Sequence, residues 1–118
     1  MKQPLNDRTR LEHMLEAADA LIAEYQSLPN GQLPDGDFRY YAFIKAVEII
    51  GEAAYRLTRA FIKAHPDVEW TLIIKLRHIL VHDYHNVDEA RLFRIIETQV
   101  PILRDWVANY LANNPEEV

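Results

Sequence analysis

The sequence predicts an all-α protein folded as an up-and-down bundle. Apolar residues recur at intervals of three and four along most of the chain, which is the spacing of one face of an α-helix. Three glycines and six prolines leave few positions for tight hairpins between strands. The length of 118 residues suits one hydrophobic core. We therefore expect residues 1–118 to form a single helical domain.

The first half of the chain predicts two helices. The first begins at Asp7 or Thr9, ends at Leu-Pro-Asn-Gly in positions 28–31, and carries an apolar stripe at Leu11, Leu15, Ala18, Ile22 and Tyr25. The second spans residues 37–65 and ends before Pro66, with its stripe at Phe43, Val47, Ile50, Ala54, Leu57 and Phe61. Gly51 in its middle, next to Ala53 and Ala54, indicates the close approach of another helix.

The second half predicts two more helices. Residues 70–82 are apolar on most of the helix circumference, so we expect this helix to be central. The fourth helix is capped by Asp88, continues to about residue 110 and is kinked by Pro101. The acidic tail, residues 113–118, is expected to fray. Short links between the four helices favour an up-and-down arrangement.

Composition excludes several classes of protein. The chain is 49% hydrophobic and 26% charged, as in soluble globular domains, and no apolar stretch reaches transmembrane length. The N-terminus lacks the apolar run of a signal peptide and there is no cysteine, so we expect a cytoplasmic protein without disulfides and without membrane association. A formal charge of −5 means that any contact with RNA must be local.

The run from Arg77 to Tyr84 carries the candidate chemistry. Arginine binds phosphate oxygens through a bidentate fork, and histidine transfers protons near neutral pH, so Arg77 and His82 suit cleavage of a phosphodiester without a metal. His82 would take the proton of a ribose 2′-hydroxyl while Arg77 stabilises the phosphate charge. The products would be a 2′,3′-cyclic phosphate and a free 5′-hydroxyl.

Helix geometry restricts this pair. Residues five apart are separated by about 140° around the axis and about 7.5 Å along it, so Arg77 and His82 do not share a face of one continuous helix. Either the helix ends near His82 and frees its side chain, or a second copy of the chain supplies the partner residue across a symmetric interface.

Two alternatives compete with the catalytic interpretation. In the structural one, Arg77 pairs with Glu48 or Glu52 on the second helix, and His82 only caps its own helix. In the metal-binding one, His78, His82 and His85 supply imidazoles at spacings of four and three. The expected break near Asp83 and the absence of an HExxH glutamate argue against a metal, and we expect neither a metal nor a cofactor.

Several segments together resemble a known family. They are Glu48-Ile-Ile-Gly-Glu-Ala-Ala54, Trp70 leading into Ile73-Ile74-Lys-Leu-Arg77, and Arg77-x4-His82-x-Tyr84 followed by Val87-Asp88. In this order they resemble the HepT-like branch of the HEPN superfamily, over about residues 8–106. The resemblance implies a homodimeric bundle of four to five helices and a metal-independent ribonuclease, the toxin of a toxin-antitoxin pair.

The resemblance also implies a partner and a modification. The antitoxin would be a small nucleotidyltransferase that transfers AMP from ATP to Tyr84, and the added phosphate would neutralise Arg77. Many members carry Asn or Asp where this chain has His78, and often Phe-Gly where it has His85-Asn86. We expect His78, Asp83, Glu48 and Glu52 to shape the site. The altered residue at position 78 supports an alternative function, a non-catalytic nucleotide-binding or adaptor subunit of a nucleotidyltransferase complex.

Overall fold

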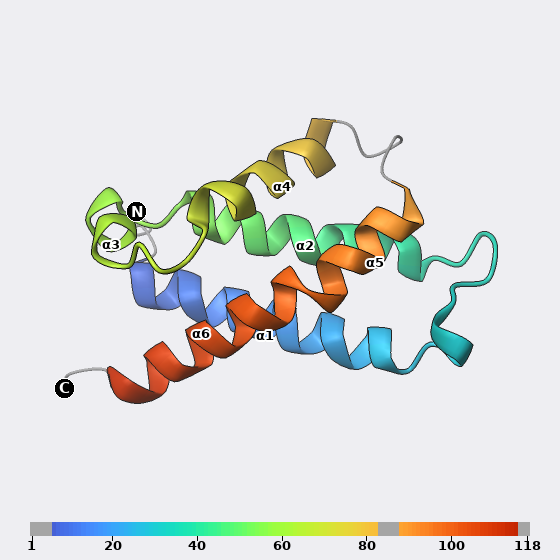
Figure 1. Cartoon of the computed structure of the whole chain (residues 1–118), viewed down its shortest axis with the longest axis horizontal. Coiled ribbons are helices and arrows are strands. Elements are labelled where there is room, and N and C mark those ends of the chain that lie inside the picture. Colours follow the sequence, from blue (N-terminus) through green and yellow to red (C-terminus); the bar gives the residue numbers. More distant parts are fainter. Residues whose placement is uncertain (1–5, 83–87, 116–118) are drawn as a thin grey trace, which may run out of the picture.

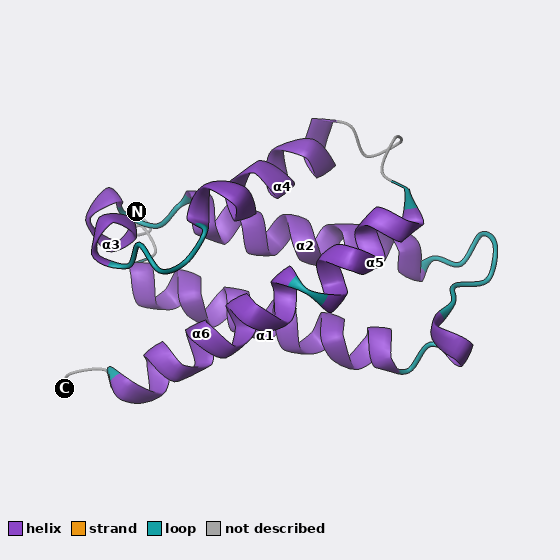
Figure 2. Cartoon of the chain, viewed as in Figure 1, coloured by secondary structure: helices purple, strands orange, loops and turns teal. Residues whose placement is uncertain are grey.

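The chain is a helical bundle whose long helices alternate in direction. A computed structural model describes residues 6–82 and 88–115, with residues 79–82 described through their backbone alone. The elements are α1 (Asp7–Gln26), the 3₁₀ turn η1 (Pro29–Gly31), α2 (Arg39–Tyr55), α3 (Arg59–Ala64), α4 (Trp70–His82), α5 (Glu89–Glu97) and α6 (Gln99–Asn113). Within these ranges there is no strand (Figure 2). The predicted all-α, up-and-down arrangement is confirmed (Figure 1).

Helix α1 begins where the sequence predicts. Its first helical residue is Asp7, and the cap lies one residue earlier, at Asn6, whose side chain accepts a hydrogen bond from the backbone N–H of Thr9 at 2.8 Å. The chain reverses after α1 at Asn30 and Gly31, which have φ angles of 56° and 66°. Asparagine and glycine are the residues that adopt this left-handed conformation most readily, so the predicted stop is confirmed.

The prediction of one helix over residues 37–65 is wrong, because the chain breaks between α2 and α3. Thr58 has extended backbone angles, and its hydroxyl accepts a hydrogen bond from the N–H of Phe61, which starts α3. The Asp7 carboxylate in turn accepts bonds from the Thr58 N–H at 2.8 Å and from its hydroxyl at 2.7 Å. These bonds hold the break in place from a position 51 residues away along the chain.

The kink predicted in the last helix is a full break into α5 and α6. It falls at Thr98, with φ −115° and ψ −66°, rather than at Pro101 itself. A proline ring clashes with the carbonyl of the residue four positions earlier, here Glu97, so the disturbance appears one turn before the proline. Asp88 caps α5 as predicted, accepting a bond from the Arg91 N–H at 2.7 Å.

Asn114, in the acidic tail, makes two hydrogen bonds to helical residues. The backbone carbonyl of Asn114 accepts a hydrogen bond from Arg8 at 2.6 Å, and the Asn114 amide donates to the carbonyl of Tyr110 at 2.9 Å. The expectation that residues 113–118 fray stays a prediction. Residues 116–118 lie outside the described residues.

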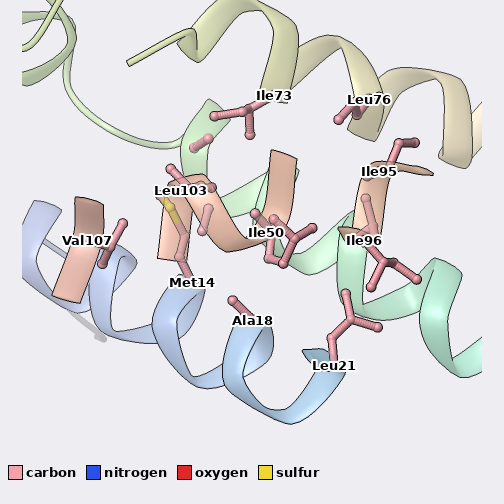
Figure 3. Close-up of a cluster of buried hydrophobic side chains, with 14 of the residues drawn as sticks. Met14, Ala18, Leu21, Ile50, Ile73, Leu76, Ile95, Ile96, Leu103 and Val107 are labelled. Atoms are coloured by element: carbon pink, nitrogen blue, oxygen red, sulfur yellow. The ribbon is translucent and has the colours of Figure 1, made fainter. Parts of the chain in front are cut away.

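Helix α2 lies at the centre of the bundle, where it packs against α1, α4 and α5. The expectation that residues 70–82 form the central helix is wrong: α4 packs mainly along α2 and lies at the edge (Figure 1). Its apolar circumference misled the prediction because Leu72 and Ile74 are only half-buried. The core joins side chains from all the long helices (Figure 3), among them Met14, Ala18, Leu21, Ile50, Ile73, Leu76, Ile95, Ile96, Leu103 and Val107. No helix in the described ranges is long and apolar enough to cross a membrane.

Candidate functional site

Gly51 and Arg77 mark the closest approach of α2 and α4. A Cβ atom built on Gly51 would lie 2.3 Å from the Cβ of Arg77 and 3.1 Å from its Cα. Real Cβ atoms essentially never come this close to another atom, so only glycine fits at position 51 without a shift of the helices. The predicted close approach at Gly51 is confirmed, and its partner is the motif arginine. The backbone of Arg77 is therefore fixed against α2.

The Arg77 side chain contacts Glu52, which directly follows Gly51 on α2. Its Nε lies 2.6 Å from Oε2 of Glu52, although the N–H is not aligned with the oxygen as in a hydrogen bond. The other carboxylate oxygen, Oε1, accepts a hydrogen bond from Nε of Arg56 at 2.9 Å. One carboxylate is thus shared by two guanidinium groups. The pairing of Arg77 with a second-helix acid is confirmed, and that acid is Glu52.

The two arginines keep Glu52 ionised. The hydrogen bond from Arg56 is the largest effect and lowers the pKa of the Glu52 carboxyl below its usual value; burial opposes it, and the charges of Arg77 and Arg56 lower the pKa further. The carboxylate is therefore charged throughout the neutral range. It remains about one-third exposed, so water screens these interactions.

Tyr55, the last residue of α2, completes this group. The Cζ atom of Arg77 lies 4.9 Å from the centre of the Tyr55 ring, and the Cζ atom of Arg56 lies 5.6 Å from it. Both distances lie within the range of a cation–π interaction. The ring itself is 52% exposed. Glu52, Tyr55, Arg56 and Arg77, which we call the α2–α4 arginine cluster, therefore face solvent together.

The other predicted site residues are more scattered. Glu48 is one turn before Glu52 on α2 and pairs with Lys45 at 3.3 Å. His78 is exposed on α4. His82 is the last residue of α4, and its side chain lies outside the described residues, as do Asp83, Tyr84 and His85. Among the described residues no group of acids and histidines could hold a metal ion, but most of the proposed three-histidine set lies outside them.

The α2–α4 arginine cluster has the chemistry of an anion site. Arginine recognises phosphate through charged, bidentate hydrogen bonds, and here two guanidinium groups already share one anion. Arg77 is the better fixed of the two, with a quarter of its side chain exposed compared with about half for Arg56. The arrangement can stabilise a negative charge that forms beside α4.

Comparison with known proteins identifies the family. The sequence profile of the family described as Ribonuclease HepT-like matches residues 14–109. The chain belongs to this HepT-like ribonuclease family. The match runs from the first half of α1 to α6 and includes Arg77, His82 and Tyr84. The family resemblance that the sequence motifs indicate is therefore confirmed.

Individual relatives of this HepT-like chain bear similar names. A protein named "Putative RNase" from Methanocaldococcus jannaschii is 32% identical over 82% of this chain and 89% of its own length. A second "Putative RNase", from Caldanaerobacter subterraneus subsp. tengcongensis, is 31% identical over 94% of this chain and 96% of its own length. A "Probable ribonuclease HepT" from Thermococcus cleftensis is 34% identical over 54% of this chain and 58% of its own length. No solved structure matches the chain.

Sequence reasoning missed Tyr55 and gave Arg56 no role of its own. A signal was present, because residues three and four apart share a helix face, and Tyr55 follows Glu52 by three and Gly51 by four. Once Gly51 marks the contact with the helix that carries Arg77, its neighbour one turn later lies beside the same contact.

Proposed function

We propose that this HepT-like chain is a metal-independent endoribonuclease in which Arg77 and His82 act on the phosphodiester. The observation that supports it most is the placement of Arg77. A glycine contact fixes its backbone against α2, and its guanidinium lies beside Glu52 near the surface, five residues before a histidine at the end of the same helix. A cation built in this way is preorganised for an anionic substrate.

The proposed reaction needs only these two side chains and the substrate. Neutral His82 takes the proton from a ribose 2′-hydroxyl, and the resulting oxygen attacks the adjacent phosphorus. The bond from phosphorus to the 5′-oxygen breaks as that oxygen takes a proton from solvent water, and protonated His82 later returns its own proton to the solvent. Arg77 stabilises the charge on the phosphate oxygens during the displacement. The products are a 2′,3′-cyclic phosphate and a free 5′-hydroxyl.

The site is proposed to be composite, formed by two copies of the chain. Helix α4 continues through His82, so the five-residue spacing directs Arg77 and His82 about 140° apart around one helix. A two-fold symmetric dimer brings Arg77 of one copy to His82 of the other. Exposed apolar side chains on α2 and α6 support association; they are Tyr41, Ile49 and Ile102.

Regulation is proposed to act through Tyr84. A cognate minimal nucleotidyltransferase, the antitoxin, would catalyse attack of the Tyr84 phenol oxygen on the α-phosphorus of ATP. A tyrosine–AMP phosphodiester forms, pyrophosphate leaves and the phenol loses its proton. The added negative phosphate would then compete with RNA for Arg77. This places the chain as the toxin of a toxin-antitoxin pair.

The deciding experiment is RNA cleavage in EDTA by the unmodified chain, with mass spectrometry to confirm that Tyr84 carries no adduct. Arg77→Ala and His82→Ala should each abolish cleavage while leaving the helical circular dichroism unchanged. Matched controls are Lys75→Ala, an exposed cation on the same helix, and His13→Ala, an exposed histidine on α1. Both controls should cleave like the parent. Mixing Arg77→Ala with His82→Ala should restore part of the activity, because a mixed dimer holds one intact composite site.

Two results would redirect the assignment. Cleavage by His82→Ala equal to that of the parent would reject this mechanism. Failure of the clean parent to cleave several RNAs, together with calorimetric binding of ATP or of a nucleotidyltransferase, would favour the alternative function as a non-catalytic nucleotide-binding or adaptor subunit.

A further inference from the structure

The Glu52 carboxylate shows where two arginines can hold a single anion. Its two oxygens contact different guanidinium groups, Oε1 with Arg56 at 2.9 Å and Oε2 with Arg77 at 2.6 Å. All three side chains are at least one-quarter exposed, but the Nε atom of Arg77 that faces Glu52 is buried, so an anion from solvent can reach this atom only when the carboxylate moves away. A phosphate group presents oxygens to both guanidiniums in the same way as this carboxylate.

Tyr55 adds a flat apolar surface to this anion site. The ring is half exposed at the end of α2, although large aromatic side chains gain stability from burial. Sites for single-stranded nucleic acid combine cations that follow the backbone with aromatic rings on which bases stack. Guanidinium planes also stack on bases, so Arg56 beside the ring extends the same surface. The chain is acidic overall, so its charge as a whole does not attract RNA, and binding needs a local site such as two arginines beside a tyrosine.

We propose that the α2–α4 arginine cluster is a nucleotide subsite for single-stranded RNA. The scissile phosphate replaces the Glu52 carboxylate between Arg56 and Arg77, and the base of the adjoining nucleotide stacks on Tyr55. The inference rests on the proposed function, in which Arg77 holds that phosphate, and it adds the substrate class and two binding residues. Duplex RNA is excluded because its bases are already stacked on their neighbours.

Glu52 is then a competitor that the substrate displaces. Its contact with Arg77 is short but not aligned as a hydrogen bond, whereas a phosphate can orient its oxygens along the N–H directions. The displaced carboxylate turns to solvent from a position that is already about one-third exposed. Removing its charge should therefore strengthen RNA binding. A Glu52 that only positions Arg77 predicts the opposite result.

The test is fluorescence anisotropy of a labelled single-stranded RNA bound to the full chain. Every protein in this test also contains His82→Ala, so that binding is measured without cleavage. Tyr55→Ala should weaken binding about tenfold, which is typical of the loss of one stacked base, whereas Tyr55→Phe should stay within about twofold. Glu52→Gln should tighten binding about threefold, because it removes the competing charge. Phe38→Ala is the matched control, an exposed aromatic residue just before the other end of α2, and should bind like the parent.

Three results would overturn the subsite. They are unchanged binding by Tyr55→Ala, equal binding of the same RNA as a duplex, and a change in the mass of the assembly with Tyr55→Ala, which would place the ring in an interface between copies. The outcome is separable from the proposed function. Cleavage by the parent that Tyr55→Ala does not alter rejects the subsite alone, whereas Tyr55-dependent binding by a parent that cannot cleave rejects the nuclease alone.

Discussion

Replacing Gly51 with alanine tests whether the contact between α2 and α4 positions Arg77. The added Cβ would lie 2.3 Å from the Cβ of Arg77, and ordinary contacts begin at 3.4 Å, so the helices must separate by about 1.1 Å. Overpacking of this kind costs about 1–3 kcal/mol, and alanine regains about 1 kcal/mol of helix propensity over glycine. We expect a net loss of about 1 kcal/mol in the free energy of unfolding, which lowers Tm by about 4 °C.

Catalysis should suffer more than stability. A displacement of about 1 Å in a catalytic group can reduce the rate about 100-fold. The rate of RNA cleavage by Gly51→Ala should therefore fall by a much larger factor than the fraction of folded protein. Ile96→Val on α5 is the matched control, because deletion of one buried methyl group costs about 0.5–1.5 kcal/mol without moving Arg77. Thermal unfolding and cleavage rates are measured for both variants. A Gly51→Ala chain that is more stable than the parent and cleaves normally would refute the reasoning.

Two further predictions concern polar contacts away from the cluster. Three hydrogen bonds from Arg39 lower the pKa of Asp37 to about 2, so NMR titration of Arg39→Ala should return this pKa towards its ordinary value of 3.8. As the pH falls, the unfolded chain protonates Asp37 before the folded chain does. The contribution of the Asp37–Arg39 pair to stability is therefore complete above pH 3.8 and is lost towards pH 2. Identical acid unfolding of the parent and the variant would contradict this. Asp7→Ala removes both acceptors of Thr58 and should cost about 1 kcal/mol, with faster hydrogen exchange at the start of α3; unchanged exchange there would show that the bonds do not hold the break.

The sequence was sufficient for features set by local chemistry. The start of α1 at Asp7, the cap of α5 and the reversal at Asn30 and Gly31 depend on residues within one or two turns. Gly51 was also informative, because glycine in a helix interior is costly and so indicates a packing reason. The residue that packs against Gly51 could be identified only once α4 was placed beside α2.

Features set at long range could not be predicted. Periodicity continues from α2 into α3 because the partly buried Phe61 and Ile62 also pack against the core. The break between the two helices depends on Asp7, 51 residues from Thr58. The choice of Glu52 over Glu48 as the partner of Arg77 depends on which turn of α2 meets α4. Similarly, an apolar circumference does not say how many neighbours a helix has, which is why α4 was wrongly placed at the centre.

Because α4 lies at the edge of the bundle, its local opening requires less free energy than unfolding of the other long helices. Because α4 packs mainly along α2, it can detach by losing this contact and the ring contacts of Trp70 with Phe61 and Trp106, while α1, α2, α5 and α6 stay together. Such a partial opening needs less free energy than unfolding of the whole chain. It would carry Arg77 away from Glu52 and Tyr55, so the α2–α4 arginine cluster comes apart while most of the bundle stays folded.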